Sequence, residues 1–217
     1  MSENGLFITF EGGEGSGKTT QINRLAQTLS QLGHKVITTR EPGGTPEAEK
    51  VRELLVQRDG GEWTPMSEIL LLFAARIQHV HHIIKPALEE GKIVICDRFT
   101  DSTMAYQGYG HEMDLEQIKS IDELTLGGFK PDLTLILDID PEEGLKRSDR
   151  RLAAEQFQVT HREDRYEQLD IEFHKRLRNG FLEIAKNEPE RCHVIPAIQE
   201  IDAISGQVAD IVREKLG

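Results

Sequence analysis

A glycine-rich segment between two apolar stretches constrains the fold of this chain more than any other feature. The short run Leu6–Phe10 has the character of a buried strand, and Thr19–Leu32 has the periodicity of an amphipathic helix. The segment between them satisfies GxxxxGK[ST] through Gly12, Gly17, Lys18 and Thr19. Glycines allow the backbone N–H groups to converge on phosphate oxygens, and the helix N-terminus adds partial positive charge. We therefore predict a phosphate-binding loop; a glycine-rich turn that fits the pattern by chance is the alternative.

This loop supplies most of the predicted ATP site. We expect Lys18 to place a point charge beside the β- and γ-phosphates, and the Thr19 hydroxyl to bind Mg²⁺, the expected cofactor. The loop residues predicted to bind ATP are Gly12, Gly13, Glu14, Gly15, Ser16, Gly17, Lys18, Thr19 and Thr20.

Short apolar runs alternate with longer amphipathic runs along the chain. The predicted strands are Leu6–Phe10, Lys35–Thr39, Ile93–Cys96, Leu133–Leu137 and His193–Ile195. The predicted helices include Thr19–Leu32, Ser67–Leu88, Leu115–Leu126, Glu142–Ala154, Gln168–Lys186 and Ile201–Leu216. This alternation predicts a three-layer α/β/α fold of the P-loop NTPase type, with a central five-stranded parallel sheet. The 217 residues suit one well-packed α/β domain, 1–217, and are few for two.

Composition narrows the class of partner. The formal net charge of −12 would repel a nucleic acid backbone, so we expect no nucleic acid partner. The first residues show no basic region followed by a long apolar run, and no stretch approaches the roughly 18 apolar residues of a membrane helix. Cys96 and Cys192 lie far apart without a CxxC pattern, which fits a reducing cytoplasm. We expect a cytoplasmic protein without a membrane partner.

A second candidate site follows the strand Ile93–Cys96. Ligands of open α/β sheets bind outside the carboxyl ends of the strands, where Asp97 and Arg98 stand. Asp97 could act on Mg²⁺ directly or through water, and the planar fork of Arg98 could bridge donor and acceptor phosphates. The alternative is an ion pair between these two neighbours at the strand end.

Five segments, in order, closely resemble the bacterial thymidylate kinases, a P-loop nucleoside monophosphate kinase family. They are FEGGEGSGKTTQ, TREPGGTPEAEKVRELL, LLFAAR, IKPALEEGKIVICDRF with STMAYQGYG, and PDLTLILDIDPEEGLKR. The resemblance spans roughly Leu6 to Glu167. It implies phosphorylation of dTMP to dTDP with Mg-ATP in dTTP synthesis, and a homodimer with long helices such as Ser67–Leu88 at its interface. A related kinase for another monophosphate or a deoxynucleoside, and a non-catalytic nucleotide sensor, are the alternatives.

The resemblance also implies an acceptor site. Arg52 would contact the acceptor phosphate directly, and Arg40 would support it without direct contact. The alternative is that Arg52 is only an exposed charge on a helix. Phe73 and Arg76 share one helix face by their spacing. The resemblance implies that Phe73 stacks on thymine and that Arg76 donates to its O4 carbonyl; the alternative is a core phenylalanine beside a snorkelling arginine. Other predicted substrate-binding residues are Glu11, Arg98, Ser102, Thr103, Tyr106 and Gln107.

Within this set, the implied roles differ. Thr103 and Gln107 would reach the base edge, and Gln107 can offer both a donor and an acceptor to N3–H and the adjacent carbonyl. Tyr106 would pack near the sugar 2′ carbon and disfavour ribonucleotides. Glu11 would contact the sugar 3′-OH; its alternatives are charge balance, or the base of a nucleoside kinase.

The phosphate-binding loop contains Glu14 and no arginine, so another segment must stabilise the charge of the transferred phosphoryl group. Arg147, Arg150 and Arg151 lie at i, i+3 and i+4 and share a helical face. This matches the family branch with arginines in a mobile lid, which we place at about residues 147–167. We predict Arg147 to bind ATP, and Arg150 and Arg151 to act in catalysis with Lys18 and Arg98. A solvated basic face is the alternative.

Overall fold

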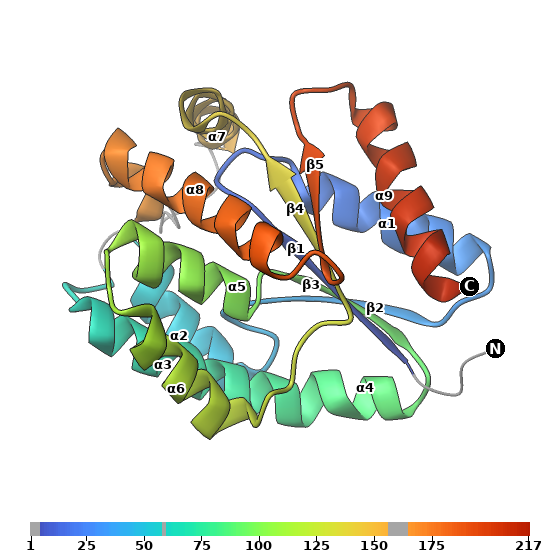
Figure 1. Ribbon diagram of the computed structural model, residues 1–217, viewed down its shortest axis with the longest axis horizontal. Coiled ribbons are helices and arrows are strands. Elements are labelled where there is room, and N and C mark those ends of the chain that lie inside the picture. Colours follow the sequence, from blue (N-terminus) through green and yellow to red (C-terminus); the bar gives the residue numbers. More distant parts are fainter. Residues whose placement is uncertain (1–4, 58–59, 156–164) are drawn as a thin grey trace.

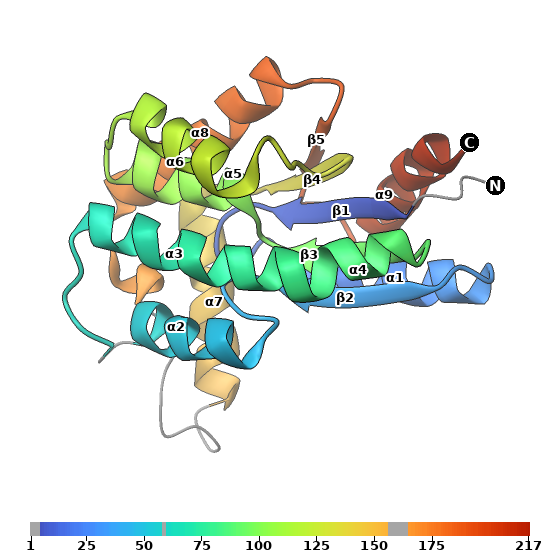
Figure 2. The ribbon, with the colours of Figure 1, turned by 90° about the horizontal axis from the view of Figure 1, so that it is seen from below.

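The computed structural model describes residues 5–57, 60–155 and 165–217. Five parallel strands form one sheet in the order β2-β3-β1-β4-β5 (Figure 1). Their bounds are β1 Leu6–Glu11, β2 Val36–Arg40, β3 Ile93–Asp97, β4 Leu133–Asp138 and β5 Cys192–Pro196. Each predicted strand is confirmed, with ends that differ by one residue. Helices cover both faces, so the predicted three-layer architecture is confirmed as well (Figure 2).

The helices connect these strands. The α-helices are α1 Lys18–Gln31, α2 Pro46–Val56, α3 Pro65–His79, α4 Lys85–Glu89, α5 Thr100–Thr103, α6 Leu115–Leu126, α7 Pro141–Glu155, α8 Ile171–Asn187 and α9 Ile201–Leu216. Two π-helical segments, η1 Val80–Ile84 and η2 Met104–Gly110, continue α3 and α5, and η3 Tyr166–Gln168 is a 3₁₀ turn.

Alternate residues of the sheet feed two separate core layers. In β1, Ile8 and Phe10 pack with α1 and α9 on one face, whereas Phe7 packs with α3, α4 and α6 on the other. A third cluster joins η2 and α8 over β4 and β5 through residues such as Ile136 and Phe181. Because side chains alternate across a strand, one short apolar strand serves both faces.

Two predicted helices differ from the observed ones. The predicted helix Ser67–Leu88 is divided into α3, η1 and α4, and its π-helical turns follow a buried residue, His79. The predicted helix Gln168–Lys186 begins later, because the Asp170 carboxylate caps α8 by accepting from the backbone N–H of Phe173 at 2.7 Å. Helix ends set by a capping side chain are harder to place than apolar periodicity.

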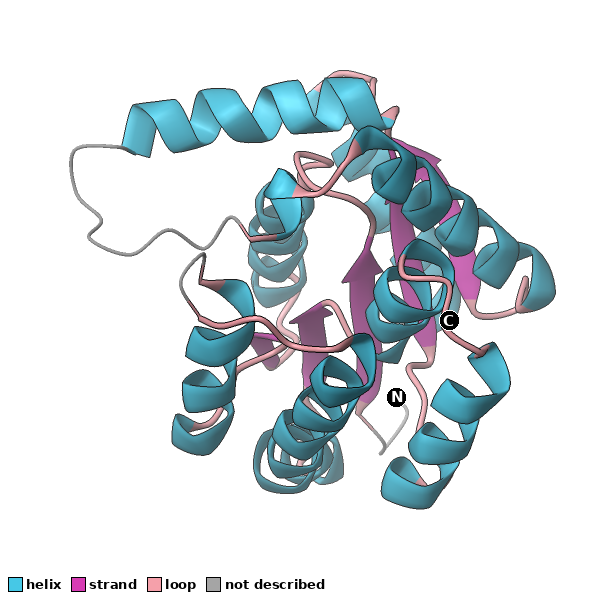
Figure 3. Cartoon of the chain, turned by 90° about the vertical axis from the view of Figure 1, so that its left-hand side faces the viewer, coloured by secondary structure: helices cyan, strands magenta, loops and turns pink. Residues whose placement is uncertain are grey.

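The carboxyl ends of the strands face one edge of the sheet. Figure 3 looks onto this edge and shows α7 crossing one side of it before the chain enters residues 156–164. These residues, within the predicted lid, lie outside the described part of the chain. No helix among the described residues is long and apolar enough to cross a membrane. Both cysteines are buried and free.

Candidate active site

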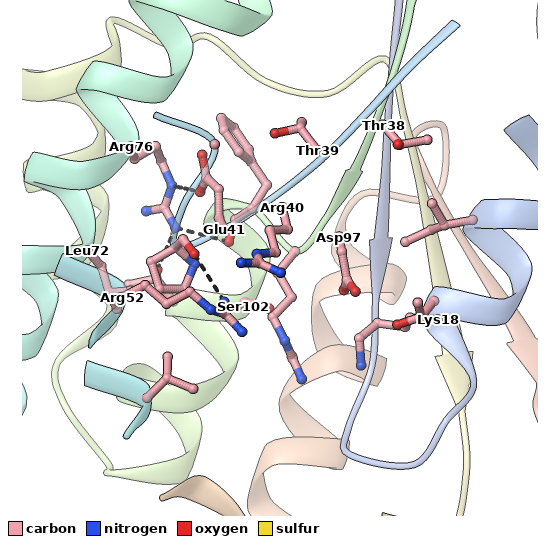
Figure 4. Close-up of a pocket in the computed structure, with 18 of the residues that line it drawn as sticks. Lys18, Thr38, Thr39, Arg40, Glu41, Arg52, Leu72, Arg76, Asp97 and Ser102 are labelled. Carbon is pink, nitrogen blue, oxygen red and sulfur yellow. Dashed lines mark hydrogen bonds and ion pairs between the residues drawn. The ribbon is translucent and has the colours of Figure 1, made fainter. Parts of the chain in front are cut away.

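One cavity of about 1570 Å³ opens at the carboxyl edge of the sheet. The phosphate-binding loop lies at one end, and α3 and η2 close the other (Figure 4). Its wall includes predicted residues from five separate segments. These are Glu14, Gly15, Ser16, Gly17, Lys18, Thr19, Thr20, Arg40, Arg52, Arg76, Asp97, Arg98, Ser102, Thr103, Tyr106, Gln107 and Arg147.

The loop keeps the geometry that its glycines predict. Gly17 precedes α1 with a φ of 91°, in the left-handed region. Gly15, with a φ of 67°, approaches α7 so closely that an added Cβ would lie 2.0 Å from the carbonyl oxygen of Gly144. Helix α7 therefore rests directly on the phosphate-binding loop.

Lys18 points into this loop. Its Nζ donates to the carbonyl oxygens of Gly12 and Gly13, both at 3.0 Å. Burial, followed by the charge of Arg98, lowers the pKa of the Lys18 ammonium to about 8, although neighbouring carboxylates oppose the shift. An anion at the loop would supply the opposite charge that this buried ammonium needs.

Glu14, a residue of the loop, contacts side chains in the middle of the cavity. Its carboxylate accepts from the Tyr106 hydroxyl and from Nη2 of Arg98, the latter at 3.2 Å. Burial opposes ionisation of Glu14, but the charges of Arg98 and Lys18 outweigh it and lower its pKa. Arg98 also lies over the Tyr106 ring, with Cζ 5.0 Å from the ring centroid. The loop glutamate is therefore an ionised partner of the predicted catalytic arginine.

The backbone of Arg98 is unusual, with a φ of 70°. A non-glycine residue in this region stores strain, which is typical of functional sites. Two flanking hydrogen bonds hold the turn: the Arg98 N–H donates to the Phe10 carbonyl at 2.9 Å, and the Phe99 N–H donates to Oε1 of Glu11 at 2.7 Å. The guanidinium reaches the loop, where Nη1 donates to the Gly12 carbonyl at 3.1 Å.

Glu11 does not line the cavity. Its carboxylate is fully buried and accepts from the Phe99 N–H and, at 2.5 Å, from the Ser102 hydroxyl. Burial and then the charge of Asp101 raise the pKa of Glu11 to about 8. The structure thus gives Glu11 a different place from the one expected by the resemblance, because its side chain supports the Arg98 turn from inside. Glu14 is the carboxylate of this pair that lies on the cavity wall.

The predicted metal residues lie at the loop end. Asp97 lies beside Lys18 in Figure 4, and its Oδ1 is buried without a hydrogen-bond partner in the described part of the chain. Thr19 is exposed in the first turn of α1 and lines the same cavity. No cluster of three or more His, Cys, Asp or Glu side chains suited to a metal occurs among the described residues. One free carboxylate and one hydroxyl suit a hydrated Mg²⁺ that is held mainly by phosphates.

Two further arginines line the side of the cavity that β2 and α2 form. Arg40 pairs with Glu49 at 3.2 Å and is largely exposed, and Arg52 donates to the Pro42 carbonyl at 3.1 Å. Both point into the space between the loop and Arg76 (Figure 4). This position suits an anionic group between the two ends of the cavity.

The far end is organised around Arg76, which is only 2% exposed. Its Nε donates to Oε2 of Glu41 at 2.6 Å, and its Nη2 donates to the Phe99 carbonyl and the Thr103 hydroxyl. Its Nη1 is buried and has no partner among the described residues. His79 buttresses the other oxygen of Glu41 at 2.9 Å. Arg76 is therefore fixed in place with one donor available to a ligand.

The structure does not place the Phe73 ring on the cavity wall. Phe73 is 2% exposed and packs in the core beside Ile69 and Val94, with Cζ of Arg76 4.8 Å above its ring centroid. Leu72, one residue earlier, lines the cavity instead (Figure 4). The two residues lie on different sides of α3, since successive helical residues are about 100° apart.

Gln107 completes this end of the cavity. It is 1% exposed, and its Nε2 donates to Oε2 of Glu68 at 2.9 Å. Its Oε1 is buried and has no partner among the described residues. Because η2 follows α5 without a break, Thr103 and Gln107 present their side chains to the same end of the cavity. Both side chains line the cavity, and each carries one buried polar atom without a partner among the described residues, Nη1 on Arg76 and Oε1 on Gln107.

The predicted lid arginines differ in position. Arg147 lines the cavity and donates to the Ala197 carbonyl at 3.1 Å and to Glu143 at 3.3 Å. Arg150 is exposed, and the side chain of Arg151 lies outside the described part of the chain. Where the lid returns, Arg165 donates to Glu68 and, at 3.1 Å, to the Leu55 carbonyl.

Sequence reasoning gave no role to several residues that shape this site. Glu41, Glu68 and Leu72 are the clearest, and Glu41 was available from its position directly after β2 and Arg40. Glu68 and Leu72 sit in an apolar helix where the sequence does not show which side faces the cavity. His79 is another such residue, fully buried between Glu41 and Thr39.

Comparisons with known proteins agree with this geometry. The sequence profile described as "Thymidylate kinase" matches residues 10–208. The chain belongs to the thymidylate kinase family. It is 50% identical to the thymidylate kinase of Caulobacter vibrioides and 46% identical to that of Geobacter sulfurreducens, with 98% of each chain covered in both cases. The crystal structure of thymidylate kinase from Ehrlichia chaffeensis superposes with a TM-score of 0.76 at 40% identity, covering 97% of this chain and 99% of that one.

Proposed function

We propose that the cavity binds ATP at the phosphate-binding loop and dTMP between Arg76 and Gln107. Membership of the thymidylate kinase family makes the chain an ATP:dTMP phosphotransferase, which forms dTDP from dTMP in dTTP synthesis. One observation carries the assignment of sites. A single cavity connects the phosphate-binding loop with a buried end formed by Arg76 and Gln107. There, Arg76 has one hydrogen-bond donor and Gln107 one acceptor without a partner among the described residues.

The buried end matches the edge of thymine. Thymine presents the O4 acceptor next to the N3–H donor, whereas cytosine presents an amino donor next to an N3 acceptor. Nη1 of Arg76 would donate to O4 and Oε1 of Gln107 would accept from N3–H. Leu72 would pack on the base from the helix side, in place of the stacked ring expected of Phe73. Cytosine would place its amino donor against the donor of Arg76 and its N3 acceptor against the acceptor of Gln107. Both pairs would lack a hydrogen bond, which is costly in a buried site.

The sugar and phosphate of dTMP would then extend toward the loop. Tyr106 lies on this path beside the carboxylate of Glu14, and Arg52 and Arg40 face it from the side. We assign Arg52 to the acceptor phosphate, with Arg40 behind it on Glu49. Ser102 and Thr103 support the site by bonding Arg98 and Arg76.

Phosphoryl transfer needs positioning and charge more than acid–base chemistry. An oxygen of the dTMP phosphate attacks the γ-phosphorus of ATP, the bond from that phosphorus to the β-bridging oxygen breaks, and ADP leaves. A phosphomonoester has a second pKa near 6 and is largely dianionic at neutral pH, so no protein base is required. Arg98 reaches both the loop and the middle of the cavity, and with Lys18 it would stabilise the charge of the transferred group.

The residues present fit Mg²⁺ as the companion of ATP. Thr19 and the unpaired Oδ1 of Asp97 would hold it, Asp97 either directly or through water. Bound there, the ion would neutralise part of the charge on the β- and γ-phosphates.

We further propose that residues 1–217 form one domain with a lid at about 147–167. Arg147 would contact ATP, while Arg150 and Arg151 would approach the transferred group when the lid covers the cavity and excludes water. The contact between Gly15 and Gly144 supports this, because it fixes the base of α7 on the phosphate-binding loop.

Two statements about context complete the proposal. A homodimer would use the long helices near α3, where Leu70 and Ile77 are exposed. Gel filtration would then give twice the mass of the chain, and a monomer mass would contradict it. A cytoplasmic site of action suits its free cysteines and its nucleotide substrates.

The test is a coupled ADP-release assay with Mg-ATP, in which dTMP and thymidine are offered separately and the product is identified by chromatography. We expect turnover with dTMP and formation of dTDP. Turnover with thymidine alone would move the acceptor from a phosphate to a hydroxyl. ADP release that does not depend on any monophosphate would favour a nucleotide sensor.

A further inference from the structure

Glu68 is a buried carboxylate of α3 that contacts no part of the phosphate-binding loop. It is 1% exposed, yet three donors from two other segments meet on it. Oε2 accepts from Nε2 of Gln107 at 2.9 Å and from the Tyr166 hydroxyl at 3.5 Å, and Oε1 accepts from Nη2 of Arg165 at 2.5 Å. Gln107 belongs to the base end of the cavity, and Arg165 and Tyr166 belong to the returning end of the lid.

We propose that Glu68 is a positioning residue that sets the orientation of the Gln107 amide and thereby the preference for thymine over cytosine. This inference rests on the proposed function, since it assumes that Gln107 reads the base.

The first step concerns the two ends of the amide. A carboxylate only accepts hydrogen bonds, so the amide must present its NH₂ group to Glu68. The opposite orientation would place the Gln107 carbonyl oxygen against a carboxylate oxygen in a buried site, where repulsion is poorly screened. Oε1 of Gln107 therefore stays on the side of the amide away from Glu68, as a buried acceptor without a partner among the described residues, on a side chain that lines the cavity.

The second step concerns the ligand. An acceptor at this position matches the N3–H of thymine or uracil and opposes the unprotonated N3 of cytosine. A freely rotating glutamine amide could present either its oxygen or its NH₂ and would accept both bases. Discrimination at N3 thus depends on a residue outside the base contact.

The third step concerns charge. Nη2 of Arg165 pairs with the buried carboxylate and supplies the opposite charge that a buried carboxylate needs. Arg165 also donates to the Leu55 carbonyl, which ties the lid's returning end to α2. The base-reading amide and the lid anchor therefore share one carboxylate.

The test is the ratio of kcat/KM for dTMP to kcat/KM for dCMP in Glu68→Gln. The substituted amide can donate as well as accept, so Gln107 can reverse. We expect the ratio to fall by about tenfold or more, since a good pair of base contacts discriminates by that order. The matched control is Glu172→Gln, which makes the same change at an exposed carboxylate of α8 that pairs with Lys175; it should keep the ratio. A folded Glu68→Gln protein with the wild-type ratio would overturn the inference.

A double-mutant cycle separates positioning from a general structural loss. Gln107→Leu should itself lower the ratio, and adding Glu68→Gln to it should lower the ratio no further. Additive losses would contradict the inference. If Glu68→Gln does not fold, Gln107→Leu still tests the inference. An unchanged ratio of kcat/KM for dTMP to kcat/KM for dCMP in that variant would overturn it. Failure of the wild-type protein to use dTMP would instead reject the proposed function, so the two failures are distinguishable.

Discussion

The two ends of the cavity hold their charged groups in different ways. At the loop end, Lys18 and Arg98 donate to carbonyl oxygens of the same loop that would receive phosphates. At the base end, the charged side chain of Arg76 is bonded to a buried carboxylate and has one donor left over. The loop end can therefore exchange its internal partners for a ligand, whereas the base end keeps them.

This difference matches the two tasks of a kinase. Negative charge on a phosphoryl group moves during transfer, and cations near it must serve both reactant and product. A base is only recognised, and a fixed donor and acceptor recognise it at low entropic cost. We therefore expect changes at the loop end to reduce turnover, and changes at the base end to reduce both binding and stability.

The largest expected effect is at the loop end, in Arg98→Ala. We expect kcat to fall by about 10³-fold, the scale for loss of a preorganised charge-stabilising group, in a protein that stays folded but melts at a lower temperature, because Glu14 loses its cation. Steady-state kinetics and thermal melting measure the two quantities. Arg213→Ala, which removes an exposed arginine paired with Asp210 on α9, should leave both unchanged. Near-normal turnover of Arg98→Ala would remove Arg98 from the mechanism.

At the base end, Arg76→Met should affect two quantities at once. It leaves the buried carboxylate of Glu41 without its cation, which costs about 3 kcal/mol of unfolding free energy. It also removes the donor to the base, so kcat/KM for dTMP should fall by about 100-fold. Urea unfolding and kinetics test this. Loss of activity at full stability would show that Arg76 is held less firmly than its contacts indicate.

The lid offers an intermediate effect. Arg150→Ala should lower kcat by about tenfold or more if this exposed side chain reaches the transferred group on closure. Arg147→Ala should lower kcat less and raise KM for ATP, because Arg147 already lines the cavity. Kinetics with varied ATP separates the two variants. A larger kcat loss in Arg147→Ala would reverse these assignments.

A smaller effect tests the two neighbouring residues of α3. Leu72→Ala should raise KM for dTMP by about tenfold with modest loss of stability, since Leu72 faces the cavity. Phe73→Ala should instead cost about 3–5 kcal/mol of stability through a core cavity. Isothermal titration calorimetry with dTMP and thermal unfolding test the two variants. Loss of dTMP binding in a still-stable Phe73→Ala protein would restore the stacking role that the sequence predicted.

The smallest expected effect is the uptake of a proton by Lys18 when ATP binds. Burial and Arg98 lower the pKa of Lys18 to about 8, so above pH 8 much of the free enzyme carries a neutral amine there. Phosphates favour the charged form and raise this pKa again, so ATP binding at pH 8.5 should take up a fraction of a proton. Calorimetry in buffers of different ionisation enthalpy measures the uptake. Lys18→Met should abolish it, and equal uptake in that variant would assign the proton elsewhere.

The predicted fold is confirmed, whereas the site residues assigned to both ends of the cavity stay predictions. The strands and the Gly12–Thr19 loop follow from local patterns, because apolar runs and glycine spacing act over a few residues, whereas the strand order was not predicted. The base end depends on contacts between distant segments, such as Arg76 with Glu41 and Gln107 with Glu68.

The individual differences have physical causes. Helical periodicity placed Phe73 and Arg76 on one face, but it does not show which side of α3 meets the cavity. Glu11 precedes the loop in sequence, yet the pleat of β1 turns its side chain toward the Phe99 N–H and away from the ligand. The buried place of His79 depends on Glu41 from another segment, a contact that local sequence patterns do not show.

The most direct test of the account is a crystal structure of the protein with dTMP and ADP. We predict that Nη1 of Arg76 lies within hydrogen-bond distance of thymine O4, that Oε1 of Gln107 faces N3, and that Leu72 packs on the ring. Lys18 and Arg98 should have exchanged loop carbonyls for phosphate oxygens, while Arg76 keeps Glu41. A base bound elsewhere, or an Arg76 that leaves Glu41 to reach it, would contradict the division of the cavity into an exchanging end and a fixed end.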